Sequence, residues 1–181
     1  MRCTKMRGKK GKPHWDPADP PRHRANNIKG HGMWENDRPP VFGVVGRQSG
    51  WIRLEVARRN DRATLCPLAR DYTLPGATVN SDEWVAYDPL PQQGRLRVKV
   101  KHSRPHPEYA RDDDGDGVRE VHCNTMEGIW TGLRNFIRPF RGVSKWHLAG
   151  YVAIFQWAHN LKTATLGFLH ALVTLNCSHQ D

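Results

Sequence analysis

Two short apolar runs on either side of a tight turn constrain the fold of this chain more than any other feature of its sequence. The first, residues 41–46, is a continuous run of strand length, and the second, residues 51–56, alternates apolar and polar side chains. Between them, Gln48-Ser49-Gly50 is typical of a turn. Strands joined by so short a connection pair antiparallel, so the pattern predicts a β-hairpin.

The elements that follow the hairpin alternate between helix and strand. Asn60-Asp61 offers a cap for a helix that ends before Pro75-Gly76. A short strand is expected at residues 77–79, then a brief helix at 84–87, and then an alternating strand at 96–100.

Beyond a polar loop, the apolar spacing changes to that of helices. One helix opens at Asn124 and runs towards Phe140, and a second opens near Ser144. This order of elements predicts an α/β fold in which helices flank a mixed sheet. A ribonuclease-H-like fold without its first strand has the same order.

By composition, the chain divides into a basic arm, a core and a tail. Residues 1–40 are rich in Pro, Gly, Lys and Arg and show no apolar periodicity, so we expect a partly disordered arm. Residues 41–165 hold the expected strands and helices, and residues 166–181 form a C-terminal tail. The arm is either a solvated tail or a segment that follows DNA phosphates through its early lysines, Lys9, Lys10 and Lys12.

The net charge of the chain favours a polyanionic partner. Lys and Arg number 28 against 18 Asp and Glu, a net charge of +10, and each cation set against a DNA phosphate releases condensed counterions. The charged N-terminus lacks the apolar segment of a secretory signal, and the apolar stretch at 151–173 holds too many polar residues to span a bilayer. We therefore expect a cytoplasmic, nucleoid-associated protein that binds DNA and no membrane.

The 4 cysteines indicate neither a disulfide framework nor a zinc ribbon, because none forms a C-x-x-C pair. We interpret them as reduced thiols of a cytoplasmic protein. The alternative is a metal site built in space from Cys123 with His102, His106 or His122. Idle thiols and loop histidines are the simpler interpretation.

Two acids stand out by their positions. Asp82 lies just beyond the end of an expected strand, and Glu127 lies one turn into an amphipathic helix. Acids from a strand end and a facing helix can share Mg²⁺ or Mn²⁺, which are hard ions that prefer carboxylate oxygens. Each acid also has a purely structural interpretation. Asp82 can cap the short helix after its strand, and Glu127 can complete a capping box with Asn124 as N-cap.

Basic residues continue from the helix of Glu127 into the next helix. Arg134 and Arg138 are i, i+4 neighbours, roughly on the side of Glu127, and Arg141 and Lys145 follow them. They either hold DNA phosphates beside bound metal or form the ordinary polar face of an amphipathic helix.

The acidic loop at residues 112–117, D-D-D-G-D-G, invites a calcium interpretation. An EF-hand needs Glu at its twelfth position, where Cys123 stands, and no helix pair is expected on either side of the loop. A solvated acidic loop is therefore the preferred interpretation.

Four sequence words, taken in order, point to a family. They are N-S-D-E-W-V-A-Y at 80–87, K-H-S at 101–103, H-C-N-T-M-E-G-I-W-T-G-L-R at 122–134 and R-G-V-S-K-W-H-L-A-G-Y-V-A-I-F-Q-W-A-H-N at 141–160. Together they resemble the ISXO2-like DDE transposases of bacterial insertion sequences, over roughly residues 8–168. One such word is weak evidence, but the ordered set is specific.

The resemblance implies a ribonuclease-H-like core that cleaves transposon-end DNA and transfers it to a target with Mg²⁺ or Mn²⁺ in a two-metal site. Under it, Asp82 matches the family's second catalytic acid and Glu127 the third. His102 matches a recurrent histidine near the site. The implied partners are the transposon ends, the target DNA and further copies of the chain assembled on DNA.

The sequence departs from the family at the first catalytic aspartate. In the family, that residue lies on the first core strand, just upstream of a basic stretch that resembles residues 8–13 here, which follow almost directly on Met1. We expect that strand, its aspartate and the family's upstream zinc ribbon to be missing. Asp16 and Asp19 lie among prolines in an irregular segment, so neither is expected to replace the missing aspartate. The expected function is a truncated, catalytically impaired transposase with an incomplete metal site. The alternative is a non-catalytic basic DNA-binding protein derived from one.

Overall fold

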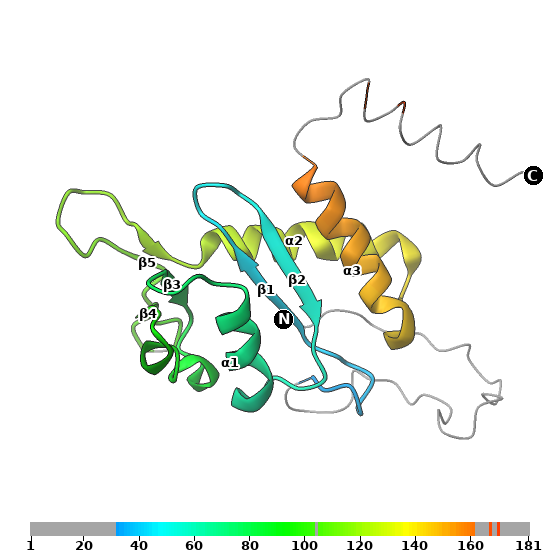
Figure 1. Ribbon diagram of the computed structural model, residues 1–181, viewed down its shortest axis with the longest axis horizontal. Coiled ribbons are helices and arrows are strands. Elements are labelled where there is room, and N and C mark those ends of the chain that lie inside the picture. The colour runs from blue at the N-terminus through cyan, green and yellow to red at the C-terminus, as the bar shows by residue number, and fades with distance from the viewer. Residues whose placement is uncertain (1–31, 104, 162–166, 168–169, 171–181) are drawn as a thin grey trace, which may run out of the picture.

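The computed structural model describes residues 32–103, 105–161, 167 and 170. Lys9, Lys10 and Lys12 of the basic arm, and most of the tail, lie outside the described residues. Within the described part, helices and short strands alternate as the sequence predicts, and the class is mixed α/β (Figure 1). None of the helices described is long and apolar enough to cross a membrane.

The predicted hairpin is confirmed. Strand β1 (Val41–Val45) pairs antiparallel with β2 (Ile52–Val56), in a register that sets Val41 opposite Val56 and Val45 opposite Ile52. Within it, Gly43 is required by close packing, because a Cβ there would lie 2.5 Å from Cε of Met126 and 2.6 Å from the ring of Trp130. The missing side chain lets the helix that carries Met126 approach β1.

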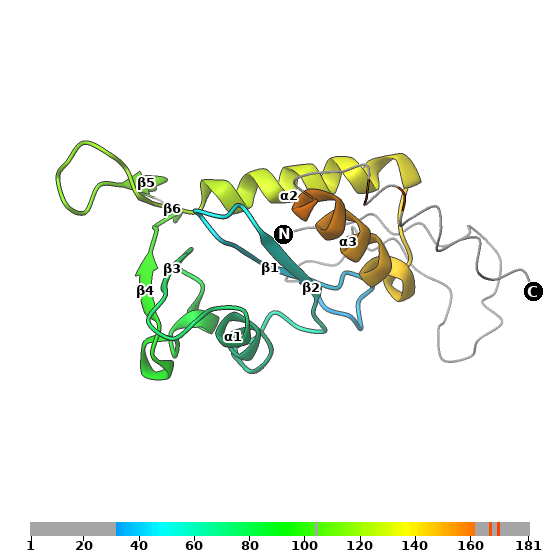
Figure 2. The same ribbon diagram turned by 45° about the horizontal axis from the view of Figure 1, so that its top comes forward.

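Helices cover both faces of the hairpin (Figure 2). On one face lie α2 (Asn124–Ile137) and α3 (Lys145–Asn160), and on the other lies α1 (Arg62–Asp71). Successive strand residues point to opposite faces, so Val41 joins the cluster under α2 and α3 while Phe42 joins the cluster under α1. The first cluster is built from Val41, Ile52, Leu54, Leu133, Ile137, Val143, Leu148 and Val152.

Strand β3 (Thr78–Ser81) pairs in parallel with β4 (Leu96–Lys99). The connection between them contains two 3₁₀ turns, η2 (Val85–Tyr87) and η3 (Pro91–Gln93), so the brief helix expected at 84–87 is present as a 3₁₀ turn. The region predicted as a polar loop holds a further antiparallel pair, β5 (Ala110–Arg111) and β6 (Val121–His122). The described residues therefore form 3 two-stranded sheets rather than the one mixed sheet that the sequence predicts.

The two edges of the hairpin differ. At β2, the side chain of Asn160 accepts a hydrogen bond from the Ile52 N–H at 2.9 Å and donates one to its carbonyl at 2.9 Å. Gln156 accepts one from the Leu54 N–H at 2.6 Å, so amides one helical turn apart replace a neighbouring strand. The other edge of β1, like one edge of β3, has no strand beside it among the described residues.

The predicted helix boundaries are confirmed at two of the three helices. Asp61 caps α1, its carboxylate accepting the Thr64 N–H at 2.9 Å. Ser144 directly precedes α3. At α2 the helix begins at Asn124 as predicted but ends at Ile137, and a 3₁₀ turn, η4 (Arg138–Phe140), continues it.

Candidate metal centre and DNA interface

Asp82 directly follows β3, and its side chain is exposed. One carboxylate oxygen accepts the Trp84 N–H at 3.1 Å. The capping interpretation is wrong in detail, because the N-cap of η2 is Trp84 and no side chain caps the turn; the Asp82 carboxylate instead bonds to the backbone two residues on. A single hydrogen bond leaves most of the acceptor capacity of this carboxylate unused.

Arg97 of β4 holds the backbone on both sides of Asp82. Its side chain is 1% exposed. The guanidinium donates to the carbonyls of Asp82 at 3.0 Å and Trp84 at 2.8 Å, and to the Ser81 hydroxyl at 2.9 Å. Asp88 accepts a further bond from the same group and pairs with it. The rigid fork of arginine can bind several oxygens at once, so Arg97 fixes the position of Asp82.

This role of Arg97 could not be predicted from the sequence. In the alternating strand at 96–100, the pattern assigns Arg97 to the solvent side. In the structure, Leu96 is 64% exposed and the Arg97 side chain points inward. A buried cation is tolerated here because Asp88 and backbone carbonyls compensate its charge.

Glu127 lies in the first turns of α2 and is exposed. The capping-box interpretation is wrong, because the N-cap is Cys123 and no side chain caps the helix there. Asn124 is already helical, so Glu127 is one residue too far along to reach back to the cap, and its own N–H bonds to the Cys123 carbonyl at 3.2 Å. Within the described residues, the Glu127 carboxylate forms no hydrogen bond or ion pair.

The charges of both acids influence the Cys123 thiol. Burial raises the pKa of this thiol, the negative charges of Asp82 and Glu127 raise it further, and it reaches about 11 despite the opposing charge of Arg47. Two carboxylates 45 positions apart in sequence (82 to 127) therefore act electrostatically on one sulfur atom. Both lie on the side of the molecule where β3 contacts β6.

Arg47 fixes the start of α2 as Arg97 fixes the segment of Asp82. It projects from the hairpin turn and donates to the carbonyl of His122 at 3.0 Å and to that of Glu120. Burial, and then the charge of Arg47, lower the pKa of His122. The hairpin thereby anchors β6, which leads directly into α2 and Glu127.

His102 lies near this region without a defined contact to either acid. Its backbone N–H donates to Glu83 at 3.1 Å, and Glu83 also accepts the Ser103 N–H at 2.9 Å and its hydroxyl at 3.1 Å. Burial acts to raise the pKa of Glu83, but these hydrogen bonds and the charge of Lys101 lower it overall. Glu83 thus links the Asp82 segment to residues 101–103 by hydrogen bonds. The sequence analysis did not single out Glu83.

The alternative site of Cys123 with histidines does not form. Among the described residues, the His, Cys, Asp and Glu side chains that gather in a group of three or more lie only in the acidic loop. The His102 imidazole instead lies 5.8 Å from the Tyr109 ring, and its Nε2 is buried with no hydrogen-bond partner in the described part of the chain.

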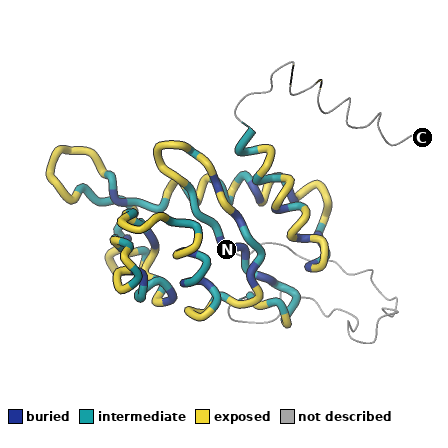
Figure 3. Tube along the Cα trace, viewed as in Figure 1, coloured by how far each residue is buried: buried dark blue, intermediate teal, exposed yellow. Residues whose placement is uncertain are grey.

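The carboxylates of the acidic loop and of nearby Glu120 gather together and accept hydrogen bonds from the loop's backbone. Ligand oxygens of Asp112, Asp114, Asp116 and Glu120 all lie within 4.8 Å of one another, an arrangement that could hold a cation. Asp112 accepts the N–H groups of Gly115 at 2.6 Å and Gly117 at 2.8 Å. Glu120 was missed because the EF-hand test looks to the twelfth position. The loop itself is exposed (Figure 3).

The predicted DNA contacts fall into two groups. Arg134, Arg138 and Arg141 are exposed, and Arg134 follows Glu127 by two helical turns, on the same face of α2. Lys145 is different, because it is only 9% exposed. Its ammonium pairs with Asp37 at 3.1 Å and donates to the Trp34 carbonyl at 3.2 Å, so it is engaged within the fold.

Comparison with known proteins agrees with this arrangement of motifs. Residues 14–160 match the family described as the ISXO2-like transposase domain. This chain belongs to that family. It is also 31% identical over 138 residues to a protein of Halobacterium salinarum described as an uncharacterized protein in transposable element ISH50.

That match covers 76% of this chain and 44% of the relative, so the chain spans less than half the length of the curated relative it matches. No solved structure matches the chain. The transposase family, together with a relative from a transposable element, supports a transposase-related function for the chain. Transposases of the DDE type generally use divalent metals, and the family implies DNA as a partner.

Proposed function

We propose that this chain is a DDE-type DNA transposase core in which Asp82 and Glu127 hold Mg²⁺ or Mn²⁺, and that it is catalytically impaired as it stands. The observations that support the proposal are the positions of the two acids: Asp82 directly follows β3, Glu127 lies in the first turns of α2, and β3 contacts β6, which leads into α2. Both carboxylates also contribute to the raised pKa of Cys123. Acids from a strand end and from a helix can share a hard divalent cation where their oxygens converge.

The donors suit a hard divalent cation. Both side chains are exposed, Asp82 accepts only the Trp84 N–H, and Glu127 forms no ion pair in the described part of the chain. When bound, the metal supplies activation of the attacking oxygen and stabilisation of the leaving oxygen in phosphodiester displacement. Arg97 holds the backbone carbonyl of Asp82, and the backbone of α2 positions Glu127. Among the described residues, the buried Nε2 of the His102 ring has no hydrogen-bond partner, and we propose His102 as an accessory group of the same site.

The impairment follows from the number of acids. In the described part of the chain, no third Asp, Glu, His or Cys completes a group with Asp82 and Glu127. Without a third ligand, two carboxylates repel each other with weaker compensation by metal. We propose a ribonuclease-H-like arrangement in which a further strand carrying that acid would lie between the open edges of β1 and β3. Phe42 of β1 and Val79 of β3 already pack in one cluster under α1.

DNA is the proposed partner of the same face. Arg134 and Arg138 lie beyond Glu127 along one side of α2 and are exposed, and Arg141 follows them. Each can neutralise one phosphate, which adds sequence-independent affinity that falls with salt. The arm lysines Lys9, Lys10 and Lys12 are proposed to extend this contact. A cytoplasmic, nucleoid-associated protein that forms homo-oligomers on DNA fits the same function.

A non-catalytic DNA-binding protein derived from a transposase is the second candidate. The hydrogen bond from the Trp84 N–H to Asp82 favours it, because it shows that this acid already has a structural use. Under this alternative the arginines bind DNA and the two acids bind no metal.

The test combines metal binding with DNA cleavage. We expect Mn²⁺ to bind the wild-type chain and to bind at least about tenfold more weakly to Asp82→Asn and to Glu127→Gln. Asp71→Asn, which alters an exposed acid at the end of α1, should leave binding unchanged. On duplex DNA carrying the terminal repeats of the chain's own element, strand transfer should be weak or absent.

Two outcomes would contradict the proposal in different ways. Metal binding that is unchanged in both acid variants would favour the non-catalytic alternative. Strong strand transfer that disappears in Asp82→Asn would support the site but show that the impairment is wrong.

A further inference from the structure

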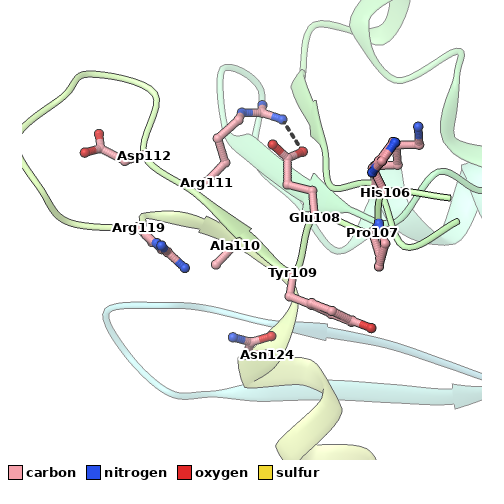
Figure 4. A pocket seen from close by; sticks show the side chains of 10 residues that line it. His106, Pro107, Glu108, Tyr109, Ala110, Arg111, Asp112, Arg119 and Asn124 are labelled. Atoms are coloured by element: carbon pink, nitrogen blue, oxygen red, sulfur yellow. Dashed lines mark hydrogen bonds and ion pairs between the residues drawn. The ribbon is translucent and has the colours of Figure 1, made fainter. Parts of the chain in front are cut away.

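A pocket of about 830 Å³ lies at the start of α2, the helix that carries Glu127 (Figure 4). Its wall comes from the segment that follows β4, from β5 and its flanks, and from the first residue of α2. The side chains used below are those of Lys101, Tyr109, Arg111, Arg119 and Asn124. A space of this volume can hold one nucleotide. A DNA duplex is too wide to enter it, since the major groove alone is about 12 Å wide.

Positive charge in this pocket is only partly compensated. Arg111 pairs with Glu108 at 2.9 Å and with Asp113, so its charge is balanced. The Asp112 carboxylate accepts the backbone N–H groups of its own loop, which lower its pKa, so it keeps its negative charge. Lys101 and Arg119 are exposed, and neither forms an ion pair within the described residues. The lining therefore sets three cations, Lys101, Arg111 and Arg119, against the two carboxylates of Glu108 and Asp112, and Lys101 and Arg119 are the cations open to phosphate.

Tyr109 gives the pocket an aromatic surface. It is 64% exposed and belongs to neither hydrophobic cluster, so burial does not explain its presence. The His102 ring lies 5.8 Å away at an interplanar angle of 39°, which supports one side of the phenol. Figure 4 shows the ring extending away from Arg119 and Asp112, between Glu108 and Asn124. Exposed aromatic rings beside cations are the feature on which unpaired bases stack.

Two residues of the pocket wall lie close along the chain, or through Glu83, to the proposed metal ligands. Asn124 lies one helical turn before Glu127 in α2. Lys101 directly precedes the segment that Glu83 holds, and Glu83 is the neighbour of Asp82. A DNA strand with its phosphodiester at the two acids would therefore pass the mouth of this pocket.

We propose that the pocket receives one unpaired nucleotide of the DNA strand bound at the metal centre. Its base stacks on Tyr109, and its phosphates lie against Lys101 and Arg119. The base must be unpaired because a base within a duplex has both faces covered by its neighbours. The inference rests on the proposed function, since it assumes that DNA binds at Asp82 and Glu127.

The experiment compares two DNA probes by fluorescence anisotropy at fixed salt: a blunt duplex, and the same duplex with a single-stranded extension. The full chain should bind the extended probe more tightly. Tyr109→Ala should lose that gain, weakening binding of the extended probe about tenfold or more while leaving the blunt duplex unchanged. Tyr109→Trp should keep or increase the gain. Trp51→Ala, which removes another exposed aromatic, serves as the matched control.

The outcomes separate this inference from the proposed function. An extension that adds no affinity to the wild-type chain, or a gain that survives in Tyr109→Ala, overturns the pocket and leaves duplex binding intact. Failure of the wild-type chain to bind either probe overturns both. If Tyr109→Ala does not fold, Tyr109→Trp decides, because a gain smaller than that of the wild type would contradict stacking.

Discussion

The two groups of acids in this molecule are held in opposite ways. In the acidic loop, Asp112, Asp114, Asp116 and Glu120 come from one short segment, and their oxygens gather within 4.8 Å. Asp82 and Glu127 come from a strand end and a helix, and only the fold brings both near the Cys123 thiol. The loop acids are held largely by N–H groups of their own segment, whereas the paired acids depend on arginines from other elements.

The two groups also differ in charge density and in the number of hydrogen bonds that their carboxylates accept. The loop concentrates more carboxylates; Asp112 accepts two backbone N–H groups, and Asp114, Asp116 and Glu120 accept one each. The paired acids are fewer, and of the two arginines that support them Arg97 is buried and Arg47 is exposed. Arg97 is 1% exposed while it holds the Asp82 segment. Side chains fixed by buried partners keep the geometry that metal chemistry requires.

The largest effect is expected where the buried support is removed. Arg97→Ala strips hydrogen bonds from the carbonyls of Asp82 and Trp84 and leaves Asp88 without its buried partner. We expect the free energy of unfolding to fall by about 3 kcal/mol or more. Urea denaturation followed by circular dichroism measures it. Arg97→Lys should recover little, because an ammonium cannot bind several oxygens in a plane.

Arg111→Ala is the matched substitution in the loop. Arg111 pairs with Glu108 and Asp113, but its side chain is 35% exposed, and such pairs contribute little to stability. Little change in the denaturation midpoint is expected. If Arg111→Ala destabilised the chain as much as Arg97→Ala, the two groups of acids would not differ in their support.

Much of the local structure could be predicted from the sequence, because it depends on local patterns. The hairpin at 41–56 and the Asp61 cap follow from spacing and a capping residue, and α2 follows from its apolar spacing, although no side chain caps its start. The arrangement of strands could not be predicted, because hydrogen bonds between distant segments leave no periodic signal. The pairs β5–β6 and β3–β4 are examples.

The candidate site was predictable in its acids but not in its supports. Sequence words singled out Asp82 and Glu127, whose roles stay predictions. Nothing in spacing indicated Arg47, Glu83 or Arg97, because each acts through backbone groups of residues remote in sequence. Lys145 differs from the exposed arginines, because its charge is used inside the fold. A lysine at a helix start was predicted to contact DNA, and burial beside Trp34 and Asp37 engages it instead.

An intermediate effect is expected at the Cys123 thiol. Replacing Asp82 with Asn, or Glu127 with Gln, removes a negative charge that disfavours the thiolate, so the thiol pKa should fall from about 11 towards its ordinary 9.0. Burial remains and limits the fall. The pH dependence of iodoacetamide labelling measures it, with peptide mass spectrometry to separate Cys123 from the other cysteines. The double variant should show the largest fall.

Loop variants provide the control for the thiol. Asp112→Asn should leave the Cys123 pKa unchanged, because the loop acids do not contribute to it. Mn²⁺ should lower the thiol pKa in the wild-type chain by offsetting the two carboxylates. A thiol pKa that responds to Asp112→Asn but not to Asp82→Asn would reverse the comparison between the two groups.

The smallest effect concerns the loop under acid. Hydrogen bonds from the N–H groups of Gly115 and then Gly117 lower the pKa of Asp112 below its ordinary 3.8. A depressed folded pKa means that the contribution to loop order is complete above 3.8 and is lost as pH falls through the lower folded value. Amide chemical shifts of Gly115 and Gly117 should therefore move only below that pH. The Gly76 amide, which bonds to the Gly94 carbonyl at 2.7 Å, should not follow them.

The core should stay folded during this change, because the hydrogen bonds that order the loop come from its own backbone N–H groups. A simultaneous loss of core signals would show that the loop supports the fold. Repeating the titration with Ca²⁺ asks whether the gathered carboxylates also serve a cation, since a bound ion would hold the two amide shifts to a lower pH.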